Sequence, residues 1–433
     1  MTTPFDTFQY RDGILYAEDV PLTKIIEAVG TPTYVYSQAA FLNPLRELQK
    51  NLSEVQHLVC FAVKSNSNIA VLKLLSENGA GMDIVSAGEL YRAGIAGIPG
   101  ERIVFSGVGK TREEIQAALQ YQGSGILSFH VESIEEMTRL NSVAGPLGRK
   151  ASFSLRFNPD VDAKTHPYIS TGLRENKFGL PLLDIKKALA QLSKSPHLEL
   201  EGLSIHIGSQ LTDLGPLRDA YRLTLDLIVD IEKTAKIRMK MIDFGGGLGI
   251  TYSTEKPPAI ADYCQAIKSA IADASKKHKR DFSDFRFLIE PGRSISGNAG
   301  VLLSEVLYRK SGPAKEFLVI DAAMNDLIRP TLYQGHHEVV PIAEKERDGK
   351  SALTDVVGPI CETGDFLARN RDIPLGIQSG SLLAILSAGA YGFTMSSQYN
   401  SRPRAAEVLV SGDRFRIIRD RESYSDLIKG EGF

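Results

Sequence analysis

Between residues 37 and 293, short apolar segments alternate with amphipathic segments, and this alternation limits the possible folds more than any other feature of the chain. Stretches such as 111–122 and 181–194 carry apolar residues at steps of three and four, as amphipathic helices do. Eight β/α repeats predict a (β/α)8 barrel. An open doubly wound sheet is the alternative, but the GxGxxG turn expected after its first strand is absent. The eight predicted strands are residues 58–64, 82–86, 102–106, 126–131, 151–157, 200–207, 239–244 and 285–290.

The rest of the chain has a different pattern. From residue 294 onward, short β-rich runs are separated by turn signals such as 311–313 and 411–413, which predicts an all-β sandwich or small barrel. A hairpin is expected over residues 5–22, and because two strands alone are not stable, it should complete this second domain. We therefore expect a barrel of residues 37–293 and a β domain of residues 1–36 with 294–433.

Composition excludes several classes of protein. The net charge of −2 over 433 residues gives no basic field for nucleic acid or an anionic membrane. The amino terminus lacks the pattern of a signal peptide, and the most apolar late segment, 377–393, is interrupted by Ser and Gly. The three cysteines, Cys60, Cys264 and Cys361, have no CxxC spacing, so we expect neither a disulfide framework nor a metal site, and a cytoplasmic location fits best.

Residues suited to chemistry gather where the predicted strands end. In a (β/α)8 barrel these carboxyl ends form one face, which holds the active site. Each residue alone has a simpler explanation, since a strand-end lysine usually extends to solvent and a single glycine turn is usually only tight. Their occurrence together on one rim favours function. The set comprises Lys64, Asp83, His206, Gly208-Ser209-Gln210, Asp243, the glycines of 245–249, and Glu290-Pro291-Gly292-Arg293.

This combination indicates pyridoxal 5'-phosphate. Glycine turns let backbone N–H groups approach an anion, and barrels favour phosphate sites near strands seven and eight. A lysine in a partly desolvated pocket can form a Schiff base, an imidazole can lie against the ring, and a carboxylate can keep the pyridine nitrogen protonated. The long connection 158–179 is expected to form a wall or lid; its ring and hydroxyl residues include His166, Tyr168, Ser170, Thr171, Lys177 and Phe178.

Several motifs in register carry a family resemblance. They are FAVKSN, DIVSAGEL, HPYISTG with KFG, EGLSIHIGSQ, DFGGGLGI, EPGRSISGNAG, DAAMNDLIRPTLY, GPICETGD and GAYGFTMSSQYNSRPR. Over nearly its whole length the chain resembles the diaminopimelate decarboxylases, of the alanine-racemase-like group that includes the ornithine and arginine decarboxylases.

The resemblance implies roles for individual residues. Lys64 would bind the cofactor, His206 would stack on its ring, and Glu290 would pair with the pyridine nitrogen. The other cofactor-binding residues would be Asp83, Ser209, Gly246, Gly247, Gly292, Arg293 and Tyr391; the substrate-binding residues would be Arg293, Arg329, Tyr333, Glu362 and Tyr391. In a homodimer with active sites at the interface, Cys361 and Glu362 would come from the second subunit, with Cys361 as proton donor. An inert buried cysteine is the alternative, but the neighbouring Glu362 and Asp365 favour function.

The expected reaction is decarboxylation of meso-2,6-diaminopimelate to L-lysine, the last step of lysine biosynthesis. Arg329 offers a planar fork for the distal carboxylate, and an uncompensated buried Arg would be costly in an ornithine decarboxylase. The nearest alternative is the same chemistry on ornithine, arginine or carboxynorspermidine. A racemase, or a catalytically silent relative that binds a partner, accounts for fewer of these residues.

Overall fold

The chain forms two compact units. The computed structural model describes residues 7–162, 176–313 and 315–432. The barrel unit comprises residues 44–250 and 256–294, and the β-rich unit comprises 251–255, 295–433 and the chain up to Asn43. The sequence assigned 37–43 and 251–255 to the barrel, whereas these residues belong to the β-rich unit. Of the predicted wall or lid, His166, Tyr168, Ser170 and Thr171 lie outside the described residues.

Eight parallel strands close into a barrel, which confirms the predicted fold and excludes the open sheet. They follow one another around the barrel in chain order, and the last pairs with the first through Phe287 and His57. From Leu58 onward every residue of the first strand is buried, because in a closed barrel one face meets the interior and the other meets helices. The strands are β5 (His57–Ala62), β6 (Gly81–Ile84), β7 (Ile103–Phe105), β8 (Ser128–Val131), β9 (Ala151–Arg156), β10 (Leu198–Ser204), β11 (Met241–Asp243) and β12 (Arg286–Ile289).

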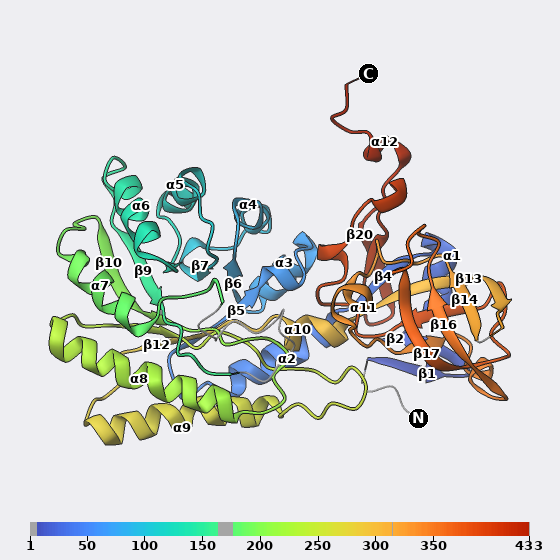
Figure 1. Ribbon diagram of the computed structural model, residues 1–433, viewed down its shortest axis with the longest axis horizontal. Coiled ribbons are helices and arrows are strands. Elements are labelled where there is room, and N and C mark those ends of the chain that lie inside the picture. The colour runs from blue at the N-terminus through green and yellow to red at the C-terminus, as the bar shows by residue number, and fades with distance from the viewer. Residues whose placement is uncertain (1–6, 163–175, 314, 433) are drawn as a thin grey trace. The chain divides into compact units, whose positions relative to one another are not determined.

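Helices surround these strands (Figure 1). Three of them begin at a hydroxyl residue, Ser86, Thr111 or Ser133, whose side chain accepts a hydrogen bond from the backbone N–H three residues later. Such caps satisfy N–H groups that the helix itself leaves without partners. The helices are α3 (Ile69–Glu77), α4 (Ala87–Ile95), α5 (Arg112–Gln120), α6 (Ile134–Ala144), α7 (Leu182–Leu192), α8 (Gly215–Ala235) and α9 (Ile260–His278); α2 (Gln38–Asn51) precedes them, and the short α10 (Arg293–Ser296) follows β12.

Two site residues lie at positions that differ from the predicted strand ends. Strand β5 stops at Ala62, and Lys64 lies in a single 3-10 turn, Val63–Ser65. The Ser65 hydroxyl closes this turn by donating to the Ala62 carbonyl over 2.8 Å. Asp83 lies inside β6 rather than at its end. Apolar character extends beyond a strand when the following turn is also buried, so the sequence pattern overestimated the strand length.

The β-rich unit contains a sheet of nine strands and a sheet of three among the residues that the structure describes. The predicted hairpin is part of the smaller sheet, which is joined to the unit by a bridge between Ile14 and Ala343 and shares its apolar core. No helix in the described ranges is long and apolar enough to cross a membrane. The smaller sheet has β1 (Phe8–Arg11), β2 (Ile14–Ala17) and β3 (Val20–Pro21); the larger has β4 (Thr33–Ser37), β13 (Gly300–Ser311), β14 (Glu316–Ile320), β15 (Val339–Pro341), β16 (Ser351–Val357), β17 (Phe366–Pro374), β18 (Leu382–Ile385), β19 (Ala406–Ser411) and β20 (Arg414–Arg419); the helices are α1 (Leu22–Val29), α11 (Arg329–Tyr333) and α12 (Tyr424–Leu427).

Candidate active site

Lys64 lies beside a buried carboxylate. Its ammonium donates to Asp83 Oδ2 over 3.1 Å, and the Lys64 side chain is 38% exposed whereas Asp83 is fully buried. Burial and the neighbouring Glu290 raise the pKa of Asp83, while Lys64 acts in the opposite direction. The lysine is therefore anchored at one end of a polar interior and remains accessible to a small reactant.

His206 follows β10 by two residues and presents a neutral ring. Burial, assisted by the charges of Lys64 and Arg156, lowers its pKa to about 3. Its Nδ1 accepts a hydrogen bond from the Gly246 N–H over 3.2 Å, which leaves the proton on Nε2. A neutral imidazole that is fixed in this way can stack on a heterocycle without adding a positive charge beside Lys64.

The glycine turn after β11 has little space for side chains. A Cβ at Gly246 would lie 2.2 Å from the Glu290 carbonyl oxygen, and one at Gly247, whose φ is +118°, would lie 2.3 Å from Leu211 Cδ1. On the same rim, Arg293 donates from Nε and one terminal nitrogen to Ser209 Oγ over 3.2 and 3.1 Å. Backbone N–H groups at close approach, a hydroxyl and a guanidinium are donors suited to a phosphate.

Glu290, directly after β12, lies within a cluster of buried ionisable groups. Its Oε1 lies 3.3 Å from both the Ser106 hydroxyl and His130 Nδ1, and His130 Nε2 lies 3.7 Å from Asp243 Oδ2. Burial alone would raise the pKa of Glu290, but the hydrogen bond from His130 and the positive charge of Lys64 bring it below its ordinary value. An ionised carboxylate in the barrel interior can receive the N–H of a protonated pyridine ring.

The predicted substrate residues Arg329 and Tyr333 lie on α11 in the β-rich unit. The Arg329 guanidinium donates to His337 Nε2 over 2.7 Å and stacks 4.4 Å from the centre of the Tyr252 ring. His337 Nδ1 lies 2.8 Å from the Leu386 carbonyl, so this nitrogen carries the proton and Nε2 is the acceptor. These contacts hold the Arg329 guanidinium in one orientation, and only 7% of the residue is exposed.

Cys361 and Glu362 are both exposed in this chain, so Cys361 is not a buried thiol. Asp365, which we expected to support function, is buried and accepts from the backbone N–H groups of Met324 and Ile360, each over 2.7 Å. It therefore shapes the loop. Tyr391 is half-buried in a turn of left-handed conformation, with a φ of +55°.

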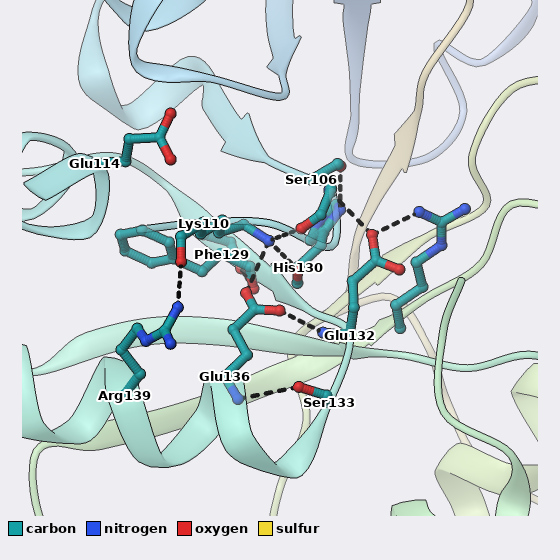
Figure 2. A network of polar contacts seen from close by, with 12 residues as sticks. Ser106, Lys110, Glu114, Phe129, His130, Glu132, Ser133, Glu136 and Arg139 are labelled. Atoms are coloured by element: carbon teal, nitrogen blue, oxygen red, sulfur yellow. Dashed lines mark hydrogen bonds and ion pairs between the residues drawn. The ribbon is translucent and has the colours of Figure 1, made fainter. Parts of the chain in front are cut away.

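Sequence reasoning missed a second polar network on the barrel rim (Figure 2). Glu132 Oε1 accepts from the Arg156 guanidinium over 2.8 Å, and Glu132 Oε2 accepts from the Gly179 N–H over 2.9 Å. Beside it, buried Lys110 donates to Glu136 Oε1 over 2.8 Å and to the His130 carbonyl over 2.7 Å. The sequence signal for this network was the pair of acidic residues four positions apart after β8, Glu132 and Glu136. The network fixes Arg156, whose charge contributes to the lowered pKa of His206.

Replacing Lys110 by methionine should lower the free energy of unfolding by about 3–5 kcal/mol, because Glu136 would remain buried without its cation. Adding Glu136→Gln should recover part of this loss, since the amide oxygen can still accept from the Glu132 N–H. Lys187→Met, at an exposed pair with Asp184, should cost less than about 1 kcal/mol. Urea unfolding of the four proteins measures these differences; a small cost for Lys110→Met alone would contradict the expectation.

The comparisons with known proteins show the family of the chain. Residues 39–297 match the family model for the pyridoxal-binding domain of pyridoxal-dependent decarboxylases. The diaminopimelate decarboxylase of Pseudomonas aeruginosa is 51% identical over 98% of this chain and 99% of its own length. The chain belongs to the diaminopimelate decarboxylase family. The Vibrio cholerae member is 48% identical, covering 98% of each chain.

Solved structures of the family share the fold. A diaminopimelate decarboxylase from M. jannaschii, in co-complex with L-lysine, superposes with a TM-score of 0.91 at 34% identity, covering 99% of this chain and 98% of that one. The Helicobacter pylori enzyme, also complexed with L-lysine, gives 0.87 at 38% identity, covering 94% and 98%. The residues of the barrel fit the family's cofactor, because the glycine turn excludes side chains where a phosphate would lie, and an amine and a buried carboxylate lie on the same rim.

Proposed function

We propose that this protein decarboxylates meso-2,6-diaminopimelate to L-lysine, with pyridoxal 5'-phosphate bound at Lys64, as the last step of lysine biosynthesis. The observation that carries the proposal is the arrangement of Lys64, the neutral ring of His206 and the buried carboxylate of Glu290 on one rim of a barrel. The same chain is about half identical to diaminopimelate decarboxylases along nearly its full length.

The cofactor supplies a protonated heterocycle that accepts the electron pair released when the bond to the carboxylate breaks. Each residue then has a defined task. Lys64 would hold the cofactor through its amine, His206 would lie against the ring, and Glu290 would keep a proton on the ring nitrogen. Ser209, Arg293 and the N–H groups near Gly246 and Gly247 bind the phosphate. Cys361 delivers the proton that replaces CO2 at the α-carbon.

Arg329 would select the substrate by binding its distal carboxylate. Diaminopimelate carries an ammonium and a carboxylate at the end remote from the reaction, and a fixed guanidinium matches a carboxylate in two hydrogen bonds. Tyr333 and Tyr391 supply further polar contacts, and Glu362 meets the distal ammonium. Ornithine lacks the distal carboxylate and would leave the buried Arg329 uncompensated.

The direct test is incubation of the pure protein with pyridoxal phosphate and meso-diaminopimelate. Release of CO2 together with L-lysine is expected, and ornithine, arginine and carboxynorspermidine should react far more slowly. Borohydride reduction of the yellow protein should leave the cofactor on the peptide that contains Lys64. Activity on another amino acid without lysine formation would reassign the substrate, and a colourless protein that binds no cofactor would refute the proposal.

Arg329→Ala should abolish the preference for meso-diaminopimelate. We expect kcat/KM for this substrate to fall about 10²- to 10³-fold, the scale of removing one partner of a buried charge pair. The slow rate on ornithine should stay the same or rise, since ornithine offers no carboxylate to Arg329 and the variant removes the guanidinium that this substrate leaves uncompensated. Arg369→Ala, an exposed arginine of the same unit, is the matched control and should leave both rates unchanged. An equal loss of kcat/KM on both substrates would show that Arg329 does not bind the distal carboxylate.

We also propose a cytoplasmic homodimer in which Cys361 and Glu362 of one subunit serve the active site of the other. Their exposure in this chain is consistent with contacts supplied by a second subunit. The three free cysteines fit a reducing compartment.

A further inference from the structure

Behind Glu290 the barrel interior holds two ionisable residues without a task in the proposed reaction. His130 lies on β8 and Asp243 ends β11, and their exposed fractions are 1% and 0%. Polar groups buried this deeply are costly unless they are paired. Yet the structure records no hydrogen-bond partner for His130 Nε2 or Asp243 Oδ2, which face each other.

The imidazole of His130 lies between two carboxylates, with one near each ring nitrogen. Nδ1 is 3.3 Å from Glu290 Oε1, and Nε2 is 3.7 Å from Asp243 Oδ2. The Ser106 hydroxyl, 3.1 Å from Nδ1, also donates to Glu290 Oε1 (Figure 2 shows His130 and Ser106). The other oxygen of Asp243 accepts from the Gly245 N–H over 2.8 Å, so its orientation is set by the glycine turn.

The same three residues also have the composition of a metal site, since one ligand atom from each lies within 4.8 Å of the others. However, the two carboxylates face different nitrogens of one imidazole, and a metal ion binds only one of these nitrogens. A carboxyl group on each side of the ring is instead suited to a chain of hydrogen bonds that runs from Asp243 through His130 to Glu290.

Charge balance decides where the protons lie. Among the described residues, the other ionisable groups that act on these carboxyls include Asp83, Lys64 and His206; His206 is neutral, and the ammonium of Lys64 is paired with Asp83. Full ionisation of Asp83, Asp243 and Glu290 would oppose three negative charges to one ammonium in the barrel interior, which is unfavourable. Burial and the nearby Glu290 raise the pKa of Asp243 well above its ordinary value, whereas the pKa of Glu290 is lowered. Asp243 is therefore the carboxyl that retains its proton.

We propose that Asp243 and His130 are positioning residues that keep Glu290 ionised and correctly oriented beneath the cofactor ring. Protonated Asp243 donates to Nε2 of a neutral His130, whose Nδ1–H donates to Glu290. This inference rests on the proposed function, because its consequence is that Glu290 alone carries the negative charge that holds the proton of the pyridine nitrogen. The reaction's electron acceptor would then depend on two residues that never touch it.

A second distribution of the same protons is an ionised Asp243 beside a positively charged His130. Asp243→Asn separates the two. An asparagine can still accept from the Gly245 N–H, and its amide can donate to His130 Nε2 as a protonated aspartate would. Under the proposal Asp243→Asn is therefore nearly silent, with kcat within about 2-fold of wild type. If Asp243 were ionised, the same change would remove a charge and disrupt the cluster.

The experiment compares holoenzymes of Asp243→Asn, His130→Asn and His130→Leu with wild type. The readouts are the absorbance of the bound cofactor across a pH range, the dissociation constant of pyridoxal phosphate, and kcat and KM. His130→Leu should lower kcat about 10- to 100-fold, the scale for residues that orient a reacting group from behind, with little change in KM. It should also shift the absorbance and weaken cofactor binding. His130→Asn keeps a donor near the position of Nδ1 and should recover most of this loss.

An unchanged absorbance spectrum in His130→Leu, or a loss in Asp243→Asn as large as in His130→Leu, would overturn the inference. If His130→Leu does not fold, Asp243→Asn still decides: kcat and absorbance close to those of wild type support the inference, and a loss of kcat of about 10-fold or more overturns it. A wild-type protein without cofactor absorbance or lysine formation would instead refute the proposed function, so the two failures are distinguishable.

Discussion

Replacing Lys64 by alanine is expected to reduce lysine formation by about 10³-fold or more, the scale of removing a residue that reacts covalently. Lys64 is suited to that role because it lies on the turn after β5 and its ammonium is held by the fully buried Asp83. Alanine would remove the attachment point for the cofactor and leave Asp83 without its cation. The variant should also lose the yellow colour of the bound cofactor after dialysis.

Two further variants make this result specific. Lys64→Arg keeps the positive charge beside Asp83 but provides no amine that can condense with an aldehyde. It should therefore be as inactive as Lys64→Ala, while its free energy of unfolding should match that of wild type. Lys73→Ala on α3 removes an exposed lysine that lies near Glu77, and it should leave rate and colour unchanged. Turnover of Lys64→Arg at the wild-type rate would remove the basis of the proposed function.

The barrel could be predicted from the sequence because eight strand and helix periods repeat, and a closed parallel sheet brings all eight strand ends to one rim. The residues at those ends were found for the same reason. His130 was missed because a histidine inside an apolar strand resembles any core position. Its importance depends on which strands meet across the interior, where it lies between residues of β11 and the end of β12.

Arg156 and Asp365 illustrate the same limit. Arg156 ends β9 in an ordinary strand pattern, and only its ion pair with Glu132 and its effect on His206 show its relevance. Asp365 stands beside the reactive residues of the GPICETGD motif, yet its partner Met324 is 41 positions away in the chain. A carboxylate that shapes a loop and one that reacts have the same sequence signature, because contacts with distant backbone groups leave no local pattern.

Cys361→Ala is expected to lower kcat about 10²- to 10⁴-fold, which is the usual contribution of a positioned proton donor. Of the three cysteines, Cys361 alone is exposed. Burial raises the pKa of Cys60 well above its ordinary value and that of Cys264 to about 12, so both thiols resist ionisation and are unsuited to proton transfer. Cys264→Ala is the matched control and should retain full activity, although it can lose some stability.

Mixing experiments then test whether Cys361 serves the partner's active site. Lys64→Ala and Cys361→Ala, each inactive alone, should regain about a quarter of the wild-type activity when their subunits are exchanged, because hybrid dimers would have one site with both residues intact. Mixing Lys64→Ala with Lys64→Ala gives the background. If exchange is demonstrated by labelled subunits and no activity returns, Cys361 acts within its own subunit or not at all. Alkylation of Cys361 in the native dimer should inactivate it in parallel, since the proton at the α-carbon would have no donor.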